Sequence, residues 1–132
     1  MARPFEHDGA ISTLEPGAPE SASAPDVMSC DAFVGDPVVN RAGEELGMLA
    51  HVMLDLASGR VAYAVLAHGG VMGLGAKLFA LPWSALRRDA KRGCFVLDVT
   101  REALRASPGF DPDHWPSKAD PRWAAPEAER RR

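Results

Sequence analysis

Few cysteines and no long apolar run mark this sequence. Cys30 and Cys94 lie far apart and neither belongs to a C-x-x-C pair, which argues against a disulfide framework and a zinc site. No apolar stretch reaches the roughly 18 residues that a membrane-spanning helix needs. Charged residues interrupt Phe5–Gly9, so the N-terminus does not read as a signal peptide. These absences predict a cytoplasmic protein with no membrane insertion, no metal and no cofactor.

A concentrated basic segment is also missing. Residues 1–36 hold seven acidic residues and one arginine, a net charge of −6. The whole chain has a net charge of −3, so the remainder has +3. Nucleic-acid binders usually gather basic residues on one face, and composition therefore disfavours nucleic acid as a partner.

Composition divides the chain into three parts. Residues 1–32 are rich in Pro, Ala, Ser, Gly and Glu, have little to bury, and are expected to form a disordered acidic leader. Residues 33–123 carry the apolar strand patterns and are predicted to form one domain. Residues 124–132 are predicted to be a charged, frayed tail.

The domain reads as short strands separated by turns, which predicts a small all-β, antiparallel barrel of five or six strands. A short helix after Thr100, whose hydroxyl can cap it, is expected near the C-terminal end of the domain. Asp55 is expected to accept backbone N–H bonds in the turn that follows it. The predicted strands are Val38–Val39, Gly47–Asp55, Arg60–His68, Lys77–Leu81 and Cys94–Val99, with Trp83–Leu86 opposite the last across a turn at Asp89–Gly93.

Apolar alternation predicts which strand faces are buried. Within Gly47–Asp55 one of the two alternating sets of residues is wholly apolar. This predicts one fully buried strand face, made of Met48, Ala50, Val52 and Leu54. Arg60–His68 is apolar on both faces, which predicts a central strand. After the helix, the aromatic segment Phe110–Pro116 is expected to pack back on the barrel.

The order and spacing of these motifs resemble the PRC-barrel family. Three stretches carry the resemblance: VNRAGEELG at 39–47, LDLASGRVAYAVL at 54–66 and GGVMGLGAKLFALPW at 69–83. The later PGF at 108–110 and HWP at 114–116 are similar to the tail of stand-alone bacterial members.

The resemblance implies a small β-barrel and two related branches with defined roles. One is the cytoplasmic part of the H subunit of photosynthetic reaction centres, and the other is the C-terminal domain of a small-subunit ribosome maturation factor. This sequence shows neither the membrane helix of the first nor the preceding domain of the second. It is most similar to stand-alone members, which implies a non-catalytic protein-interaction or adaptor module.

No set of residues predicts catalysis. The loop Gly69–Lys77 has no Gly-Lys-Ser/Thr ending and precedes a strand, so it does not form a phosphate-binding loop. His51, His68 and His114 have no metal-ligand spacing. Ser84 lies in no G-x-S-x-G turn. We therefore expect a protein that is not an enzyme.

Apolar residues in the same glycine-rich loop are the candidate interface. Val71, Met72 and Leu74 either plug one end of the barrel or form an exposed patch for a protein partner. Trp83 and Trp115 are expected in the core or as a seal of a barrel end. A domain this small has a marginal core and exposed sheet edges, which favours a homodimer.

A second hypothesis is association with RNA or the ribosome, as in the maturation-factor branch. Its candidate contacts are Arg87, Arg88, Lys91 and Arg92, which cluster around one predicted turn. A basic cluster at a turn is more often simply exposed to solvent, and Asp89 reduces the net positive charge of this one.

Overall fold

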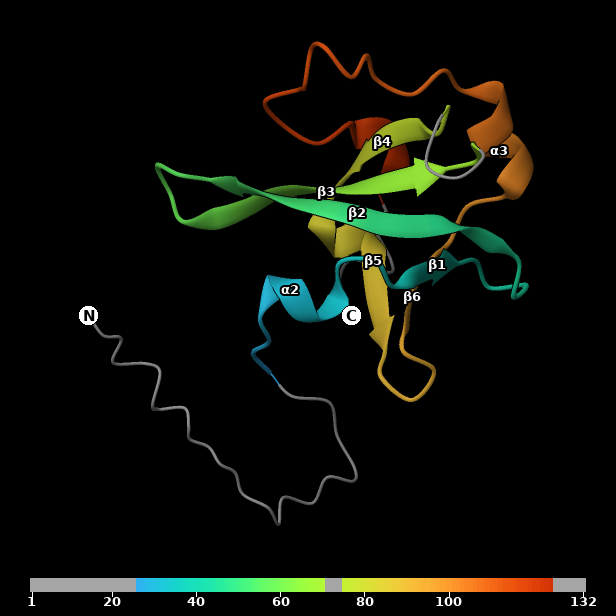
Figure 1. The fold of residues 1–132 in the computed structure, drawn as a ribbon, viewed down its shortest axis with the longest axis horizontal. Coiled ribbons are helices and arrows are strands. Elements are labelled where there is room, and N and C mark those ends of the chain that lie inside the picture. The colour runs from blue at the N-terminus through green and yellow to red at the C-terminus, as the bar shows by residue number, and fades with distance from the viewer. Residues whose placement is uncertain (1–25, 71–74, 125–132) are drawn as a thin grey trace.

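The computed structural model describes residues 26–70 and 75–124, which form one curled sheet with short helices at its margins (Figure 1). This confirms the all-β fold with a short helix after the last strand. The predicted leader and tail lie mainly outside these residues and stay predictions. The elements are α2 (Cys30–Phe33), β1 (Pro37–Val39), β2 (Glu45–Asp55), β3 (Arg60–His68), β4 (Lys77–Leu81), η1 (Trp83–Ala85), β5 (Leu86–Asp89), β6 (Cys94–Leu97), α3 (Arg101–Ala106) and η2 (Pro121–Trp123).

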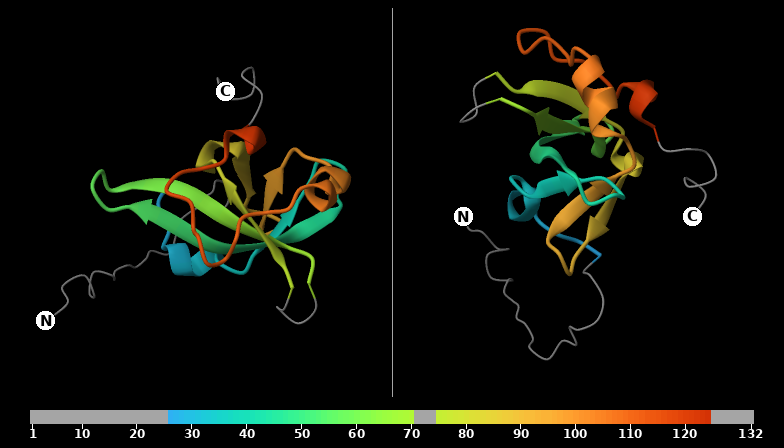
Figure 2. Two further views of the ribbon diagram at one scale, coloured as in Figure 1. Left: turned by 90° about the horizontal axis from the view of Figure 1, so that it is seen from above. Right: turned by 90° about the vertical axis from the view of Figure 1, so that its right-hand side faces the viewer.

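The strands lie in the order β4-β3-β2-β1-β6-β5, and the sheet curls into a half-barrel (Figure 2). Four neighbouring pairs are antiparallel, as predicted. The pair β1–β6 is parallel, with Val38 opposite Phe95, so an entirely antiparallel barrel was a wrong prediction for this pair. A tight turn forces antiparallel pairing, whereas β1 and β6 are distant in the chain and no turn sets their direction.

Strand β3 is central and apolar on both faces, as predicted. Ala64 and Leu66 face the main core, and Tyr63 and Val65 face a smaller cluster that includes Ala80. Because alternate residues of a strand point to opposite faces, β3 serves two cores. The main core consists of Phe33, Val38, Leu46, Leu49, Ala64, Leu66, Phe79, Leu81, Phe95, Leu97, Leu104 and Trp123.

The buried face predicted for β2 is wrong. Leu49 is fully buried, while Met48 and Leu54 are 47% and 53% exposed. The register with β3 shifts between Leu49 and His51, which leaves Ala50 as an extra residue. A β-bulge of this kind reverses which side chains face the core, so simple alternation along the whole strand fails.

Residues 108–123, which we call the strap, pack back on the sheet as predicted for the aromatic segment (Figure 1). The Phe110 N–H donates to the Leu78 carbonyl at 2.8 Å, and the Asp120 N–H donates to the Ala80 carbonyl at 2.9 Å. Both carbonyls belong to β4, so the strap covers the outer edge of this strand. Trp123 ends the strap inside the main core.

Candidate interaction surface

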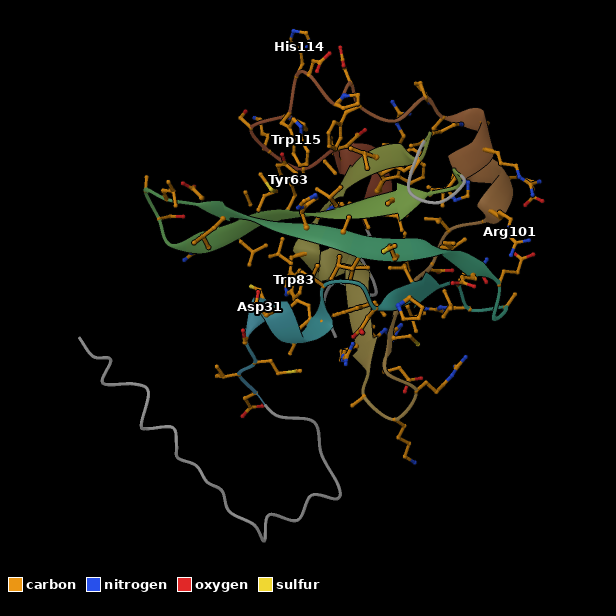
Figure 3. The ribbon with its side chains drawn as sticks, in the orientation of Figure 1. Asp31, Tyr63, Trp83, Arg101, His114 and Trp115 are labelled. Atoms are coloured by element: carbon orange, nitrogen blue, oxygen red, sulfur yellow. The ribbon has the colours of Figure 1, made fainter. Side chains whose placement is uncertain are left out.

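An apolar groove of about 360 Å³ opens between α2 and the β2–β3 hairpin. Trp83 lies between these two elements and keeps 37% of its surface exposed (Figure 3). We call this feature the Trp83 groove. Its apolar lining comes from five parts of the chain, namely residues 27–33, β2, β3, η1 and β6, and consists of Val27, Met28, Phe33, Val52, Val61, Trp83 and Phe95. Asp26, Cys30 and Arg88 complete the lining.

Three aromatic rings form a contact triangle at the Trp83 groove. The ring centroid of Phe33 lies 5.5 Å from that of Phe95 and 5.9 Å from that of Trp83. The centroids of Trp83 and Phe95 lie 6.0 Å apart. Tilted and edge-to-face pairs at these distances are favourable. Because α2 has only four residues, it depends on the buried Phe33 rather than on helix propensity for its position.

Arg88 fixes the segment after α2 to β5. Its Nη1 donates to Asp36 Oδ2 at 2.7 Å, and its guanidinium lies 4.9 Å from the centroid of the Phe95 ring. Both side chains of the ion pair are only a quarter exposed, so the pair is partly shielded from solvent. Arg88 thus has a structural role beside the groove, which the sequence-based hypothesis of an RNA contact did not anticipate.

The other basic candidates lie around the β5–β6 turn. Arg87 and Lys91 line a shallow depression of about 410 Å³ together with Arg41 and Arg88. Arg92 pairs with Asp89 at 3.5 Å, and Arg41 pairs with Asp98 at 3.6 Å. Carboxylate partners reduce the positive potential that would attract phosphate groups. RNA contact by Arg87, Arg88, Lys91 and Arg92 stays a prediction.

The two edges of the sheet are poor docking sites for another strand. The strap covers the outer edge of β4, as described above. At the other edge, β5 has four residues and carries Arg87, Arg88 and Asp89. Short, charged edge strands resist pairing with another chain. The Trp83 groove is therefore a better docking site for a partner than either edge of the sheet.

Val71, Met72 and Leu74, the residues of the predicted interface, lie outside the described residues, so that interface stays a prediction. Lys77, the last residue of the predicted loop, lies within the described residues and contacts α3. Its Nζ donates to the carbonyls of Arg105 at 2.7 Å and Ser107 at 2.8 Å. These carbonyls lie at the end of α3, where a cation is stabilising. Lys77 thus binds a helix C-terminus.

The histidines make separate local contacts. The His68 Nδ1 lies 2.6 Å from the Leu46 carbonyl, and the His51 ring packs edge-on against Trp115. The His114 Nδ1 lies 2.9 Å from Asp111 Oδ2. The Asp113 N–H and then the His114 ring, both bonded to the Asp111 carboxylate, lower the pKa of Asp111. Within residues 26–70 and 75–124, no three His, Cys, Asp or Glu side chains group as a metal site.

Family comparison agrees with this fold. Residues 25–104, more than half of the chain, match the PRC-barrel domain. This protein belongs to the PRC-barrel family. Among curated proteins, no sequence matches it significantly. In the described part of this PRC-barrel protein, no helix has the length and apolarity to cross a membrane.

One solved structure similar to this PRC-barrel protein is from Pseudomonas aeruginosa and is described as the 16S ribosomal RNA processing protein RimM. The two share 18% sequence identity with a TM-score of 0.40. The match covers 57% of this chain and 45% of the Pseudomonas chain, so this chain spans less than half of that protein.

Sequence patterns did not reveal the surface of this PRC-barrel protein that the structure brings together. A core position for Trp83 and Trp115 is wrong, because both lie more than a third exposed at the surface, and a sealing role at a barrel end stays a prediction. Trp123 enters the core instead. The sequence signal for the groove was Met28 and Phe33, two apolar residues at the end of a polar segment.

Proposed function

We propose that this PRC-barrel protein is a non-catalytic interaction module that works as a homodimer and docks on another protein. The Trp83 groove is the observation that carries the proposal. It leaves a tryptophan and several aliphatic side chains at the surface, where partly exposed aromatic residues commonly anchor protein interfaces.

The sheet edges support the groove as the docking surface. Backbone donors of the strap occupy the carbonyls of Leu78 and Ala80 on β4. The opposite edge presents two arginines and an aspartate, which disfavour strand addition. A partner therefore gains most from burying the apolar surface of the groove.

Light scattering of the full chain after gel filtration tests the homodimer. At tens of micromolar protein we expect about twice the 14.1 kDa mass of one chain, falling toward one chain on dilution. A mass of one chain at every concentration contradicts the homodimer. Affinity capture from the host lysate, with and without nuclease, tests the second half of the proposal: a protein retained after nuclease supports docking on a protein partner.

Association with RNA is the alternative, and the basic depression beside the β5–β6 turn favours it. Arg87 and Lys91 line the depression and are exposed, and the exposed Arg92 follows Lys91 in the turn. A variant with Arg87, Lys91 and Arg92 replaced by alanine tests it, because Arg88 is left in place to hold Asp36. RNA affinity that falls with salt and is lost in this variant supports the alternative. Equal, weak binding by both proteins contradicts it.

A further inference from the structure

A cavity of about 400 Å³ lies between the strap and β4, and we call it the strap cavity. The strap arches over the outer edge of β4 (Figure 1), and residues of both segments line the cavity. Its volume is within the range of small-molecule pockets, about 300–1,000 Å³. Its described lining shares no residue with that of the Trp83 groove, so a role for the strap cavity does not depend on the proposed docking surface.

The walls of the strap cavity are mostly apolar. Phe79 and Trp123, only 3% and 5% exposed, contribute two rings that pack edge to face with their centroids 5.4 Å apart. Leu78 and Phe110 line the cavity beside the 2.8 Å bond between their backbones. An apolar group that entered the cavity would leave water for contact with these side chains. The walls therefore favour a ligand with an apolar body.

Charge in the strap cavity is predominantly positive. Its charged lining residues are Lys118, Asp120 and Arg122, which give a net charge of +1 at neutral pH. The Asp120 carboxylate already has partners, because its Oδ1 accepts the Arg122 N–H at 3.0 Å and its Oδ2 lies 3.8 Å from Arg122 Nε. Within the described residues, the Lys118 ammonium has no ion-pair or hydrogen-bond partner. Lys118 is thus the cation that remains for a ligand.

Two further donors in the lining of the strap cavity have no acceptor. The Ala80 carbonyl accepts the Asp120 N–H at 2.9 Å, and in an antiparallel ladder the N–H and the carbonyl of one residue point to the same side. The Ala80 N–H therefore faces the strap, yet no carbonyl in the described part of the strap accepts it. The indole N–H of Trp123 likewise donates to no group of the described residues, and it is not sealed from solvent. Both groups can donate to a ligand.

We propose that the strap cavity binds a small organic carboxylate with an aromatic or branched apolar body. The body packs against Phe79 and Trp123, while the carboxylate accepts from the Ala80 N–H and pairs with Lys118. The three groups without a partner are all donors, which selects an anion over a cation, and a carboxylate accepts several hydrogen bonds at once. A small inorganic anion would gain nothing from the apolar walls.

Two-dimensional nitrogen–proton NMR of the full chain tests the site, with phenylacetate as the probe. We expect saturating shifts at the Ala80 and Ala119 amides and the Trp123 indole, with a dissociation constant on the order of 1 mM or tighter. The indole signals of Trp83 and Trp115, which are not in the lining of the cavity, are internal controls and should stay in place. Equal shifts at all three indoles, or none at Ala80 and Trp123, overturn the proposed site.

The neutral analogue phenylacetamide tests the charge. It has the same ring and nearly the same size, so the cavity should bind it about five-fold more weakly than phenylacetate. Lys118→Met should weaken phenylacetate binding by a similar factor and leave phenylacetamide binding nearly unchanged. Lys91→Met, in the exposed turn between β5 and β6, is the matched control and should keep the wild-type preference. Equal affinity of the wild type for both probes overturns the assignment of a carboxylate.

Filling the strap cavity tests the place of the apolar body. Ala119→Phe adds a ring to the lining and keeps all three charged side chains, so it should abolish the phenylacetate shifts. Ala119→Ser adds only a hydroxyl group and should retain binding. Circular dichroism and the urea midpoint of unfolding check the fold of each variant, and Lys118→Met carries the test where Ala119→Phe does not fold. Wild-type affinity in a folded Ala119→Phe overturns the strap cavity as the site and leaves the proposed homodimer and the Trp83 groove untouched.

Discussion

The hydroxyl of Tyr63, in the central strand β3, donates a 2.8 Å hydrogen bond to the carbonyl of Pro116 in the strap. It joins residues 53 positions apart and places a polar anchor within an apolar cluster. Burial raises the pKa of Tyr63, because the phenolate would lose its hydration. The strap is thus fastened to the sheet by a group that must remain neutral.

Tyr63 predicts a loss of stability in alkaline solution. The folded pKa lies above the unfolded value of about 10, so the folded state holds this proton more tightly. The stabilisation is complete below pH 10 and is lost as the pH rises through the folded pKa. Since Tyr63 is the sole tyrosine in the sequence, its ultraviolet absorbance reports its titration directly. We expect Tyr63→Phe to be less stable at neutral pH by about 1 kcal/mol and to lack this alkaline component. Equal alkaline losses in both proteins would contradict the assignment.

Replacement of Lys77 by methionine keeps the aliphatic stem and removes the ammonium group from the end of α3. The carbonyls of Arg105 and Ser107 then lose their donor. We expect the free energy of unfolding in urea to fall by about 1–2 kcal/mol. The exposed Lys91→Met is the matched control and should change it little.

Asn40 is the buried polar side chain of the described core region. Its Oδ1 accepts from the N–H groups of Ala42 and Glu44, and its Nδ2 donates to Glu44 Oε1 and the Val99 carbonyl. We expect Asn40→Ala to cost about 3 kcal/mol in the free energy of unfolding, since a buried side chain loses four part-buried hydrogen bonds. Ser58→Ala, which removes an acceptor of the Arg60 N–H in an exposed turn, should cost under about 1 kcal/mol. Similar losses in the free energy of unfolding for Asn40→Ala and Ser58→Ala would show that burial of the side chain does not decide the size of the loss.

Two glycines with nearly equal φ separate backbone strain from crowding. Gly59 has φ of +77° and open space where a Cβ would lie, whereas Gly109 has φ of +75° and the Leu78 carbonyl 2.8 Å from that position. Gly59→Ala should cost about 1 kcal/mol for the left-handed backbone. Gly109→Ala should cost roughly 3 kcal/mol, because the strap must also move away from β4. Urea unfolding of both variants measures the difference.

Local patterns foretold the elements whose signals lie within a few residues. The predicted bounds of Arg60–His68 and Lys77–Leu81 agree with β3 and β4. Asp55 accepts the Ala57 N–H in its turn, and Thr100 accepts the Ala103 N–H at the start of α3, as predicted. Turns and caps depend on hydrogen bonds between near neighbours, and that is why the amino-acid order suffices for them.

Other features depend on partners distant in the chain. The bulge at Ala50 lies between Leu49 and Val52 and allows both to pack on the same core while β2 pairs with β3, and apolar alternation does not reveal it. The parallel pairing of β1 and β6 likewise cannot be predicted from a local turn, because no turn joins these two strands.

By itself, the sequence determined the PRC-barrel motifs, most strands and the turns that join them, since each depends on nearby residues. Only the tertiary structure decided the Trp83 groove. Phe33, Val52 and Trp83 come from separate segments, and the Arg88–Asp36 pair joins two of the segments that surround them. A surface built from distant segments is set by how the sheet curls, because packing and not residue order brings such side chains together.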